Sequence, residues 1–331
     1  MVGDISIYCD LPHKFLYQGI PGIGRMIPCD KCNARSIIYQ KYSGRHLCSH
    51  HFEEDVHRKV REVLRPYRIF GKPCRIGVAV SGGKDSTSLL CILHSLFSDR
   101  EDVELIAISI DEGIEGYRSG TLDAARSVAK RLNLDHVVRS FKDVYDVTTD
   151  EMALQDHKQG PCTFCGVLRR NLLNRTAREL GADALATGHN LDDEAQTVML
   201  NYLKGDIDRL YRLRPRRVLE GMVPRIKPLR RVPEKEVAIY AMTHDLPMDF
   251  SSCPYITRAI RQEVKSTLNE FEAKHPGTRY SIMRGFDRIL DLQAPSESYQ
   301  VVPCTLCGEP SSNGICASCK LLEKIRGIQG V

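Results

Sequence analysis

Short apolar runs alternate with amphipathic stretches through the middle of this 331-residue chain. Runs of aliphatic and β-branched residues, which are typical of buried strands, occur at four places: 75–80, 103–110, 136–141 and 184–187. Apolar residues at helical spacing follow the first run at 87–96 and the second at 122–132. Strands that alternate with helices predict an α/β fold with a doubly wound parallel sheet, whose ligands bind at the carboxyl ends of the strands.

The first strand is followed by a glycine-rich turn that leads directly into a helix. Its residues are Ser81, Gly82, Gly83, Lys84, Asp85 and Ser86. The glycines let the backbone approach a phosphate, and the helix N-terminus directs N–H groups and the positive end of its dipole at it. Lys84 adds a positive charge, the serines add hydroxyls, and Asp85 could hold Mg²⁺. The Walker A spacing is absent. The alternative interpretation is a glycine turn with an N-capping serine.

Two other segments follow predicted strands. Asp111 could contact a nucleotide or cap the turn after its strand. The sequence Gly188-His-Asn-Leu-Asp-Asp193 follows the strand at 184–187. Asn190 before acidic residues is typical of a helix N-cap. Nucleotide and metal contacts also collect where a helix starts at a strand's carboxyl end, so both interpretations stay open.

Charge adds a candidate partner. The chain has 47 Lys and Arg against 42 Asp and Glu, a net charge of +5 that permits a polyanionic partner without requiring one. Nine basic residues lie between 206 and 231, against three acidic ones. Such a run usually forms a solvated face. Because it lies near the predicted site, we favour nucleic-acid contact, with Arg214, Arg216 and Arg217 as candidates.

Hydropathy predicts the compartment. No apolar run reaches the length of a membrane span, and the N-terminus lacks the pattern of a signal peptide. We therefore expect a cytoplasmic protein with no membrane partner. Its 13 cysteines are then informative, because eight of them form four Cys-x-x-Cys pairs. In a cytoplasmic chain such pairs usually indicate metal binding rather than disulfides.

Two groups of paired ligands predict two zinc sites, one near each end of the chain. The first comprises Cys29, Cys32, Cys48 and His51, and the second comprises Cys304, Cys307, Cys316 and Cys319. Zn²⁺ needs four tetrahedral ligands, and Cys48-x-x-His51 completes the first set better than the adjacent His50. The alternative for the first group is a set of unligated surface cysteines. The second group has the spacing of a zinc ribbon.

These features divide the chain into four expected parts. Residues 1–27 form an N-terminal extension, and 28–70 form a zinc-binding module with a charged amphipathic linker helix at 52–68. Residues 71–295 form the α/β domain, whose helical C-terminal part includes helices predicted at 234–244 and 257–274. Residues 296–331 form the zinc ribbon and tail.

A third cysteine pair, Cys162 and Cys165, follows a glycine–proline turn and precedes a basic helix. The helix N-terminus and nearby arginines are expected to lower the pKa of these thiols. By itself the pair is compatible with a redox pair, a zinc half-site or part of an iron–sulfur site. Cys253 is the one unassigned cysteine in a plausible loop. Three cysteine ligands would leave one iron of a cluster open to another ligand.

In this order, the motifs resemble those of a known family. A zinc module, the SGGKDS loop, Cys-x-x-Cys-Gly, Gly-His-Asn-x-Asp-Asp, a downstream Cys-Pro and a terminal zinc ribbon are similar to those of the tRNA 2-thiouridine synthetases. These are the TtuA-type and eukaryotic cytosolic thiouridylase proteins of the PP-loop ATP pyrophosphatase superfamily. The resemblance implies an α/β PP-loop domain flanked by an N-terminal zinc finger and a C-terminal zinc ribbon. The opening segment before Pro28 is longer than is usual in the family.

The resemblance also implies roles for individual residues. ATP would bind the residues from Ser81 to Ser86, with Gly188 and His189 near the nucleotide. A [4Fe–4S] cluster would be held by three catalytic cysteines, Cys162, Cys165 and Cys253, and its fourth iron would bind sulfide. Asp193 corresponds to an acidic residue that assists the chemistry in relatives. Some relatives place a catalytic lysine at Arg169, where a permanently protonated guanidinium favours an electrostatic role over proton transfer.

The implied reaction is ATP-dependent tRNA 2-thiolation. The C2 oxygen of uridine leaves poorly, so AMP is first transferred to it and pyrophosphate departs, stabilised by Lys84, Mg²⁺ and the loop amides. Sulfide then displaces AMP and gives 2-thiouridine. The implied partners are tRNA and a sulfur donor, either free sulfide or a ubiquitin-like thiocarboxylate carrier, with a homodimer as a further expectation. The alternatives are a tRNA 2-thiocytidine synthetase and a non-enzymatic zinc-ribbon RNA-binding protein.

Overall fold

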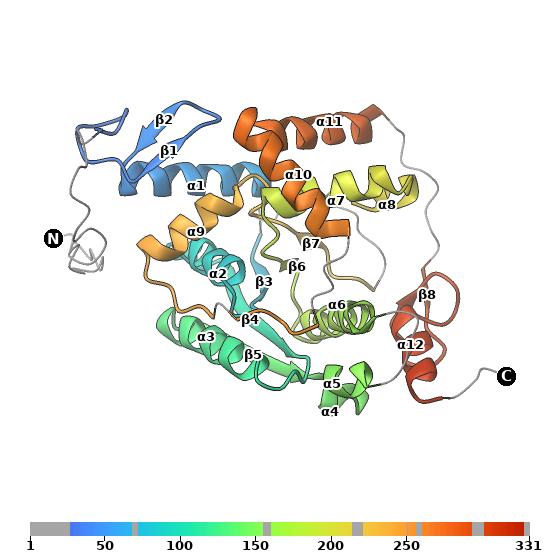
Figure 1. Cartoon of the computed structure of the whole chain (residues 1–331). Helices are drawn as coiled ribbons and strands as arrows, with labels where there is room; N and C mark the ends of the chain where they lie inside the picture. The colour runs from blue at the N-terminus through green and yellow to red at the C-terminus, as the bar shows by residue number, and fades with distance from the viewer. Residues whose placement is uncertain are drawn as a thin grey trace. The chain divides into compact units, whose positions relative to one another are not determined.

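The computed structural model describes seven stretches of the chain: 27–67, 72–154, 160–213, 221–249, 251–255, 260–292 and 301–327. They belong to two compact units, one ending at Phe52 and the other beginning at Glu53. Figure 1 labels their helices and strands. In these stretches, no helix has both the length and the apolar character needed to cross a membrane.

The larger unit is built on a five-stranded parallel sheet in the order β5-β4-β3-β6-β7. The strands are β3 (Cys74–Ala79), β4 (Val103–Asp111), β5 (Asp135–Ser140), β6 (Ala184–Ala186) and β7 (Arg225–Ile226). The predicted parallel α/β sheet and its first four strands are confirmed, whereas β7 lies inside the basic run and was not predicted. The chain moves outward from β3 to β5 and then returns to the other side of β3. In doubly wound folds ligands bind where the strand order reverses, which places the expected crevice at the carboxyl ends of β3 and β6.

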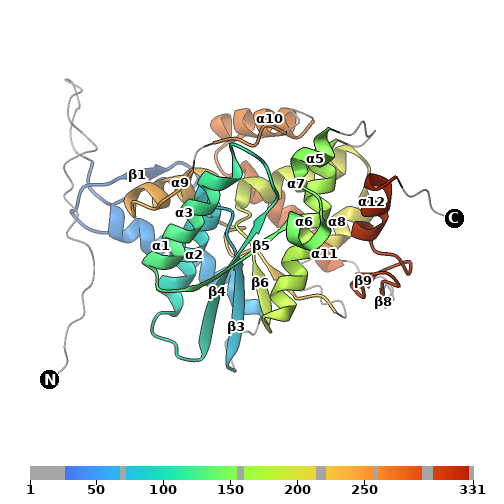
Figure 2. The same ribbon diagram turned by 90° about the horizontal axis from the view of Figure 1, so that it is seen from below.

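Helices cover both faces of the sheet. Helices α2 (Lys84–Phe97) and α3 (Arg118–Arg131) lie on one face, and α6 (Pro161–Glu179) lies on the other (Figure 2). The short helices α4 (Phe141–Tyr145) and α5 (Thr149–Ala153) precede α6. Helix α9 (Glu234–Thr243), which was predicted, packs against α2. The sheet and its helices therefore match the doubly wound architecture.

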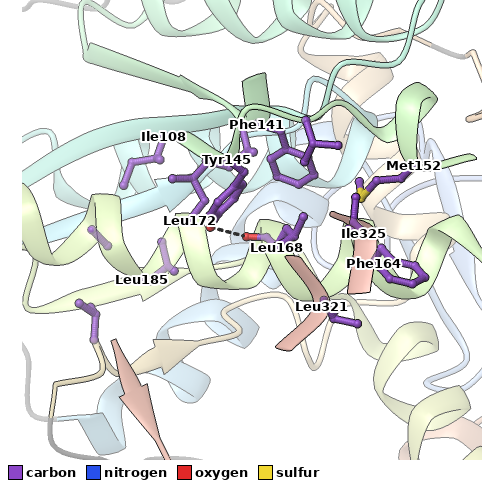
Figure 3. Close-up of a cluster of buried hydrophobic side chains, with 14 of the residues drawn as sticks. Ile108, Phe141, Tyr145, Met152, Phe164, Leu168, Leu172, Leu185, Leu321 and Ile325 are labelled. Carbon is purple, nitrogen blue, oxygen red and sulfur yellow. Dashed lines mark hydrogen bonds between the residues drawn. The ribbon is translucent and has the colours of Figure 1, made fainter. Parts of the chain in front are cut away.

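One hydrophobic core lies between the sheet and α6 (Figure 3). Phe141, Phe164 and Leu168 are almost completely buried there. The Tyr145 hydroxyl donates a hydrogen bond to the Leu168 carbonyl at 3.4 Å, which ties α4 to α6. Helix α12 (Ala317–Ile325), near the C-terminus, packs on the same core and on α6. This packing fixes the helix whose first turn carries the central cysteine pair.

A second core joins four helices. They are α7 (Leu191–Leu203), α8 (Ile207–Arg212), α10 (Ile260–Lys274) and α11 (Thr278–Leu292). Val264 and Leu268 of α10 are buried in it. Helix α10 was predicted, but its predicted first residues, 257–259, lie outside the described chain. Helix α11 was not predicted.

The smaller unit contains the antiparallel strands β1 (Ile38–Gln40) and β2 (Arg45–Leu47). Helix α1 (Ser49–Leu64) follows, in place of the helix predicted at 52–68. Near the other end of the chain, β8 (Val302–Pro303) and β9 (Pro310–Ser311) form a hairpin before α12. The first predicted group of zinc ligands lies on both sides of the β1–β2 hairpin, and the second lies within and after the β8–β9 hairpin.

Candidate nucleotide and metal sites

The turn after β3 is closed by its own side chains. The Ser81 N–H donates to the Ser86 hydroxyl oxygen at 3.0 Å, and that hydroxyl donates to the Gly83 carbonyl at 3.0 Å. Gly82 has a φ of +89°, and a Cβ there would lie 1.8 Å from the Thr121 carbonyl oxygen. Only glycine fits this position, because the turn approaches α3 too closely for any side chain.

The N-terminus of α2 has the form of an anion site. Gly83 is the residue before α2, and no side chain caps the helix. The Ser86 hydroxyl bonds back into the turn instead, so the alternative of an N-capping serine is wrong. Without a side-chain cap, the first N–H groups of the helix and its dipole remain directed at the turn. This is the local geometry that binds phosphate.

The segment after β6 reaches the same turn. A Cβ on Gly188 would lie 3.1 Å from the Asp85 backbone. Asn190 caps α7 by accepting the Asp193 N–H at 3.1 Å, and its amide donates to the Asp85 carboxylate at 3.0 Å. The N-cap interpretation of Asn190 is therefore confirmed, and the same side chain also contacts the turn after β3, whereas contact with a nucleotide or a metal stays a prediction. His189 is exposed beside this contact, with its Nδ1 3.0 Å from the Thr187 hydroxyl.

Asp193 is the most perturbed carboxyl group of this crevice. Partial burial and the nearby charges of Asp85 and Glu234 together raise its pKa from 3.8 to about 6, although the Asn190 N–H and Arg261 act in the opposite direction. The Asp193 carboxylate also accepts the Asn190 N–H at 3.2 Å, which completes a capping box. A carboxyl group with a pKa near 6 can accept a proton at neutral pH.

The end of β4 provides a residue that was not predicted. Asp111 accepts the Gly113 N–H at 2.9 Å and so caps its turn, which confirms one of the two predictions made for this residue. The next residue, Glu112, is 4 % exposed. Its Oε2 lies 2.7 Å from Arg118 Nε, and its Oε1 lies 3.3 Å from Arg169 Nη1. The sequence offered one signal for Glu112, a charged residue directly after a buried strand. It did not indicate the partners, because Arg118 and Arg169 lie 6 and 57 residues away.

Arg118 extends this chain of charges to the phosphate loop. Its guanidinium is 4 % exposed and donates to the Ser81 carbonyl at 2.7 Å. On the other side, Arg169 interacts electrostatically with Cys165 and Cys253. Glu112 therefore connects the loop after β3 with the central cysteines through two arginines.

Three cysteines converge near Arg169. Cys162 and Cys165 lie in the first turn of α6, and the Cys162 thiol donates to the Tyr255 carbonyl at 2.6 Å. Cys253 lies two residues before Tyr255 and interacts electrostatically with both Cys162 and Cys165. Lowered pKa values were predicted for Cys162 and Cys165, and the prediction is wrong for Cys165; Cys253, for which no lowering was predicted, also has a raised pKa. Burial raises the pKa of both thiols and Glu112 adds to the rise, and together they outweigh Arg169.

The donor set of these cysteines fits an iron–sulfur cluster. Three thiols converge from two segments, and the hydroxyl of the buried Thr149 lies beside Cys165. In the described chain, the groups of metal-binding atoms within 4.8 Å of one another do not include this triad. A cluster of several irons separates its ligands further than a single ion does, and thiolates are its usual ligands.

Both predicted zinc groups are assembled. In each, the four ligand atoms lie within 4.8 Å of one another: Cys29, Cys32, Cys48 and His51 form one group, and Cys304, Cys307, Cys316 and Cys319 form the other. Burial alone would raise the pKa of Cys29 and Cys304, but backbone N–H groups lower the pKa of each thiol to about 6. In each group this one thiol favours the thiolate form, and the four close ligand atoms fit a tetrahedral Zn²⁺ site.

The C-terminal zinc group is fastened to α6. Glu309, 3 % exposed, forms an ion pair with Arg178 and accepts a hydrogen bond from Asn174 at 3.5 Å. Its backbone carbonyl accepts the Cys304 N–H at 2.8 Å. One residue therefore holds both Cys304, a predicted zinc ligand, and the far end of α6, the helix whose N-terminal part carries Cys162.

Several cations of the basic run between residues 206 and 231 form ion pairs within the protein, so the run is only partly a solvated face. Lys227 pairs with Glu194 at 2.6 Å, Arg230 with Asp287 at 2.8 Å and Arg231 with Glu62 at 3.1 Å. These three cations stabilise contacts within the larger unit. The three arginines expected to contact nucleic acid, Arg214, Arg216 and Arg217, lie outside the described residues.

The comparisons with known proteins agree with this geometry. Residues 52–268 match the PP-loop domain, and residues 29–53 match the N-terminal LIM domain of the 2-thiouridine synthetase TtuA. The class is thus a PP-loop protein with an added metal-binding module. More particularly, the chain belongs to the TtuA/NcsA-type family of tRNA 2-thiouridine synthetases, as the following relatives show.

The tRNA 2-thiolation protein NcsA of Haloferax volcanii is 39% identical over 91% of this chain and 99% of its own. The tRNA-5-methyluridine(54) 2-sulfurtransferase of Pyrococcus horikoshii is 35% identical over 88% of this chain and 92% of its own. The U34-tRNA thiolase NcsA of Methanococcus maripaludis, solved with its [4Fe-4S] cluster, aligns with a TM-score of 0.81 and 36% identity, covering 93% of this chain and 100% of its own.

Proposed function

We propose that this protein is a tRNA-uridine 2-sulfurtransferase that uses ATP to activate C2 of the uridine. The observation that carries the proposal is the chain of ion pairs through Glu112. It joins a phosphate-binding turn, by way of Arg118, to three cysteines beside Arg169. Nucleotide chemistry and sulfur chemistry would therefore occur in one connected site, as a coupled thiolation requires.

The first step is adenylation. The C2 oxygen of uridine attacks the α-phosphorus of ATP, the bond to pyrophosphate breaks, and N3 loses its proton. The turn from Ser81 to Ser86 and the N-terminus of α2 bind the phosphates, and Lys84 stabilises the charge that develops on pyrophosphate. Asp85 is the candidate ligand for Mg²⁺. Asp193, whose pKa of about 6 suits a base at neutral pH, accepts the proton.

The second step replaces oxygen with sulfur. A sulfide attacks C2, and the original oxygen leaves with AMP. Cys162, Cys165 and Cys253 would hold a [4Fe–4S] cluster, which supplies an open iron that can bind sulfide. Arg169 keeps a positive charge beside these cysteines, where it can attract anionic sulfur and stabilise negative charge at C2. Gly188 and His189 line the nucleotide side of the crevice.

Structural zinc and tRNA complete the proposal. We propose that each group of four ligands holds one Zn²⁺ and that the four-part division of the chain reflects these modules. Arg214, Arg216 and Arg217 would contact tRNA phosphates, so replacing all three with Gln should flatten the salt dependence of tRNA binding. The sulfur donor would be free sulfide or a thiocarboxylate carrier. A cytoplasmic location and a homodimer remain part of the proposal.

One experiment tests the reaction. The full chain, with its cluster reconstituted without oxygen, is incubated with tRNA, ATP and sulfide. Pyrophosphate is measured alongside the nucleosides, which are separated and identified by mass spectrometry. We expect 2-thiouridine and pyrophosphate in a fixed ratio, both dependent on tRNA. Thiolated cytidine would support the 2-thiocytidine alternative, and tRNA binding without pyrophosphate would support the non-enzymatic one.

A further inference from the structure

One carboxylate of the crevice lies between two lysines from different elements. Glu234, the first residue of α9, has its Oε1 3.1 Å from Lys84 Nζ of the phosphate loop. Its Oε2 lies 3.0 Å from Lys265 Nζ of α10. All three side chains are partly exposed, at 28 to 35 %. An anion therefore already occupies the space between two cations at the mouth of the phosphate site.

Packing fixes Lys265 in this place. Its neighbour Val264 and the next turn's Leu268 are buried against α7, so α10 cannot rotate without opening that core. Figure 1 shows α10 crossing α7. Arg261, one turn before Lys265 on the same face, donates to the Thr197 hydroxyl of α7 at 3.4 Å. The basic face of α10 is thus directed toward α7 and the phosphate loop.

Glu234 can release the lysines at modest cost. Since it is the first residue of α9, the helix dipole stabilises its negative charge even without an ion-pair partner. Its partial exposure lets water replace the ammonium groups. A polyphosphate carries more negative charge and more acceptor oxygens than one carboxylate, so it would compete well for the same two cations.

We propose that Lys265 is a second phosphate-binding residue for ATP, and that Glu234 occupies its position between Lys84 and Lys265 until the nucleotide binds. The proposal rests on the proposed function, in which the loop after β3 binds ATP. The β- and γ-phosphate oxygens would replace the Glu234 carboxylate between the two ammonium groups. Lys265 would then share the charge of the departing pyrophosphate with Lys84.

Opposite effects of two substitutions test this exchange. Binding of ATP, inorganic pyrophosphate and AMP to the full chain is measured by calorimetry in the presence of Mg²⁺. Lys265→Gln should weaken ATP and pyrophosphate binding about tenfold and leave AMP within about twofold, because AMP lacks the β- and γ-phosphates. Glu234→Gln should tighten ATP and pyrophosphate binding several-fold, because it removes the competing charge. Lys265→Arg should retain most of the binding.

Matched substitutions on exposed residues of α10 control for net charge. Lys274→Gln and Glu270→Gln should leave all three affinities unchanged. The inference is overturned if Lys265→Gln binds ATP like the wild type, if it loses AMP equally, or if Glu234→Gln weakens ATP. The proposed function fails separately, if wild-type protein binds no ATP or if Lys84→Ala binds ATP normally.

Discussion

The phosphate loop and the three-cysteine site are connected through Glu112, yet their residues come from very different distances along the chain. The loop is one stretch of six residues, from the turn after β3 into the first turn of α2, and it is closed by its own serine hydroxyl. The cysteine site combines the first turn of α6 with the segment around Cys253. A local site forms wherever its strand and helix form. A site assembled from distant segments depends on the packing of everything between them.

This difference has a chemical counterpart. The loop presents backbone N–H groups and a lysine, which are ready to meet an anion without any change in protonation. In the cysteine site, the partly buried thiols of Cys165 and Cys253 have raised pKa values, so forming thiolates there requires a compensating positive charge. Metal supplies such a charge, which couples occupancy of this site to its ionisation. The two halves should therefore respond to different perturbations.

The largest expected effect is on the nucleotide half alone. Lys84→Ala removes the cation nearest the phosphate loop and should lower tRNA-dependent pyrophosphate release by about 10²–10³-fold. Iron and zinc contents should not change, because the ion-pair partners of Lys84 in the described residues are Asp85 and Glu234, which belong to none of the three groups of cysteines. Pyrophosphate release and elemental analysis on the same preparation check both statements. A variant that thiolates tRNA at the normal rate would contradict the adenylation mechanism.

Cys253→Ala should instead change the metal content of the cysteine site. Wild-type protein prepared without oxygen should contain roughly four irons per chain, and the variant should lose them while both zinc ions remain. Iron and zinc analysis with visible absorbance measures the change. Cys91→Ala is the matched control, because Cys91 lies on α2 and belongs to none of the three metal groups. Iron retained in the Cys253 variant would remove it from the ligand set.

The connection between the halves can be weakened at Glu112. Glu112→Gln leaves the buried Arg118 without its counter-charge, which should lower the free energy of unfolding by about 3 kcal/mol. Glu104→Gln removes a carboxylate of β4 from an exposed pair with Arg75 on the neighbouring β3 and should cost under about 1 kcal/mol. Urea unfolding of both variants measures the difference. Equal costs would show that Glu112 is not a buried connection.

The smallest effect concerns Asp193 and has the opposite sign. Its pKa of about 6 lies above the ordinary value of 3.8, so this group lowers stability progressively as the pH rises from about 4 to about 6, and the full penalty remains above that. Asp193→Asn, which can keep the capping hydrogen bond, should raise the free energy of unfolding by roughly 2 kcal/mol at pH 7.5. This gain should disappear as the pH falls from about 6 toward 4, because the wild-type carboxyl group is then protonated in the native state.

Urea unfolding at pH 7.5, 6 and 4.5 follows this gain. Asp208→Asn, on an exposed position of α8, should give no gain at any of these pH values. Thiolation by the Asp193 variant should fall even as its stability rises, since the raised pKa serves proton transfer at the expense of stability. A variant with unchanged activity would remove Asp193 from the chemistry.

Local patterns in the sequence determined the strands of the sheet core, the phosphate loop, the helix cap at Asn190 and the two groups of zinc ligands. Each of these depends on residues within about 20 positions of one another, through strand propensity, helix capping or metal-ligand spacing. The short strand β7 and helix α11 escaped prediction. β7 has only two residues, whereas the buried Met283, Phe286 and Leu290 of α11 stand at helical spacing and were an available signal.

Only the tertiary structure decided which distant side chains meet. The reversal of strand order at β3 brings Asn190 to Asp85, and the packing of α10 on α7 brings Lys265 to Glu234. The same is true of Glu112 with Arg169, whose contact depends on α6 lying across the sheet. Such contacts are selected by the burial of whole helices, and the sequence distance between the partners gives no local signal. The chemistry of each half is therefore readable from sequence, whereas their connection is not.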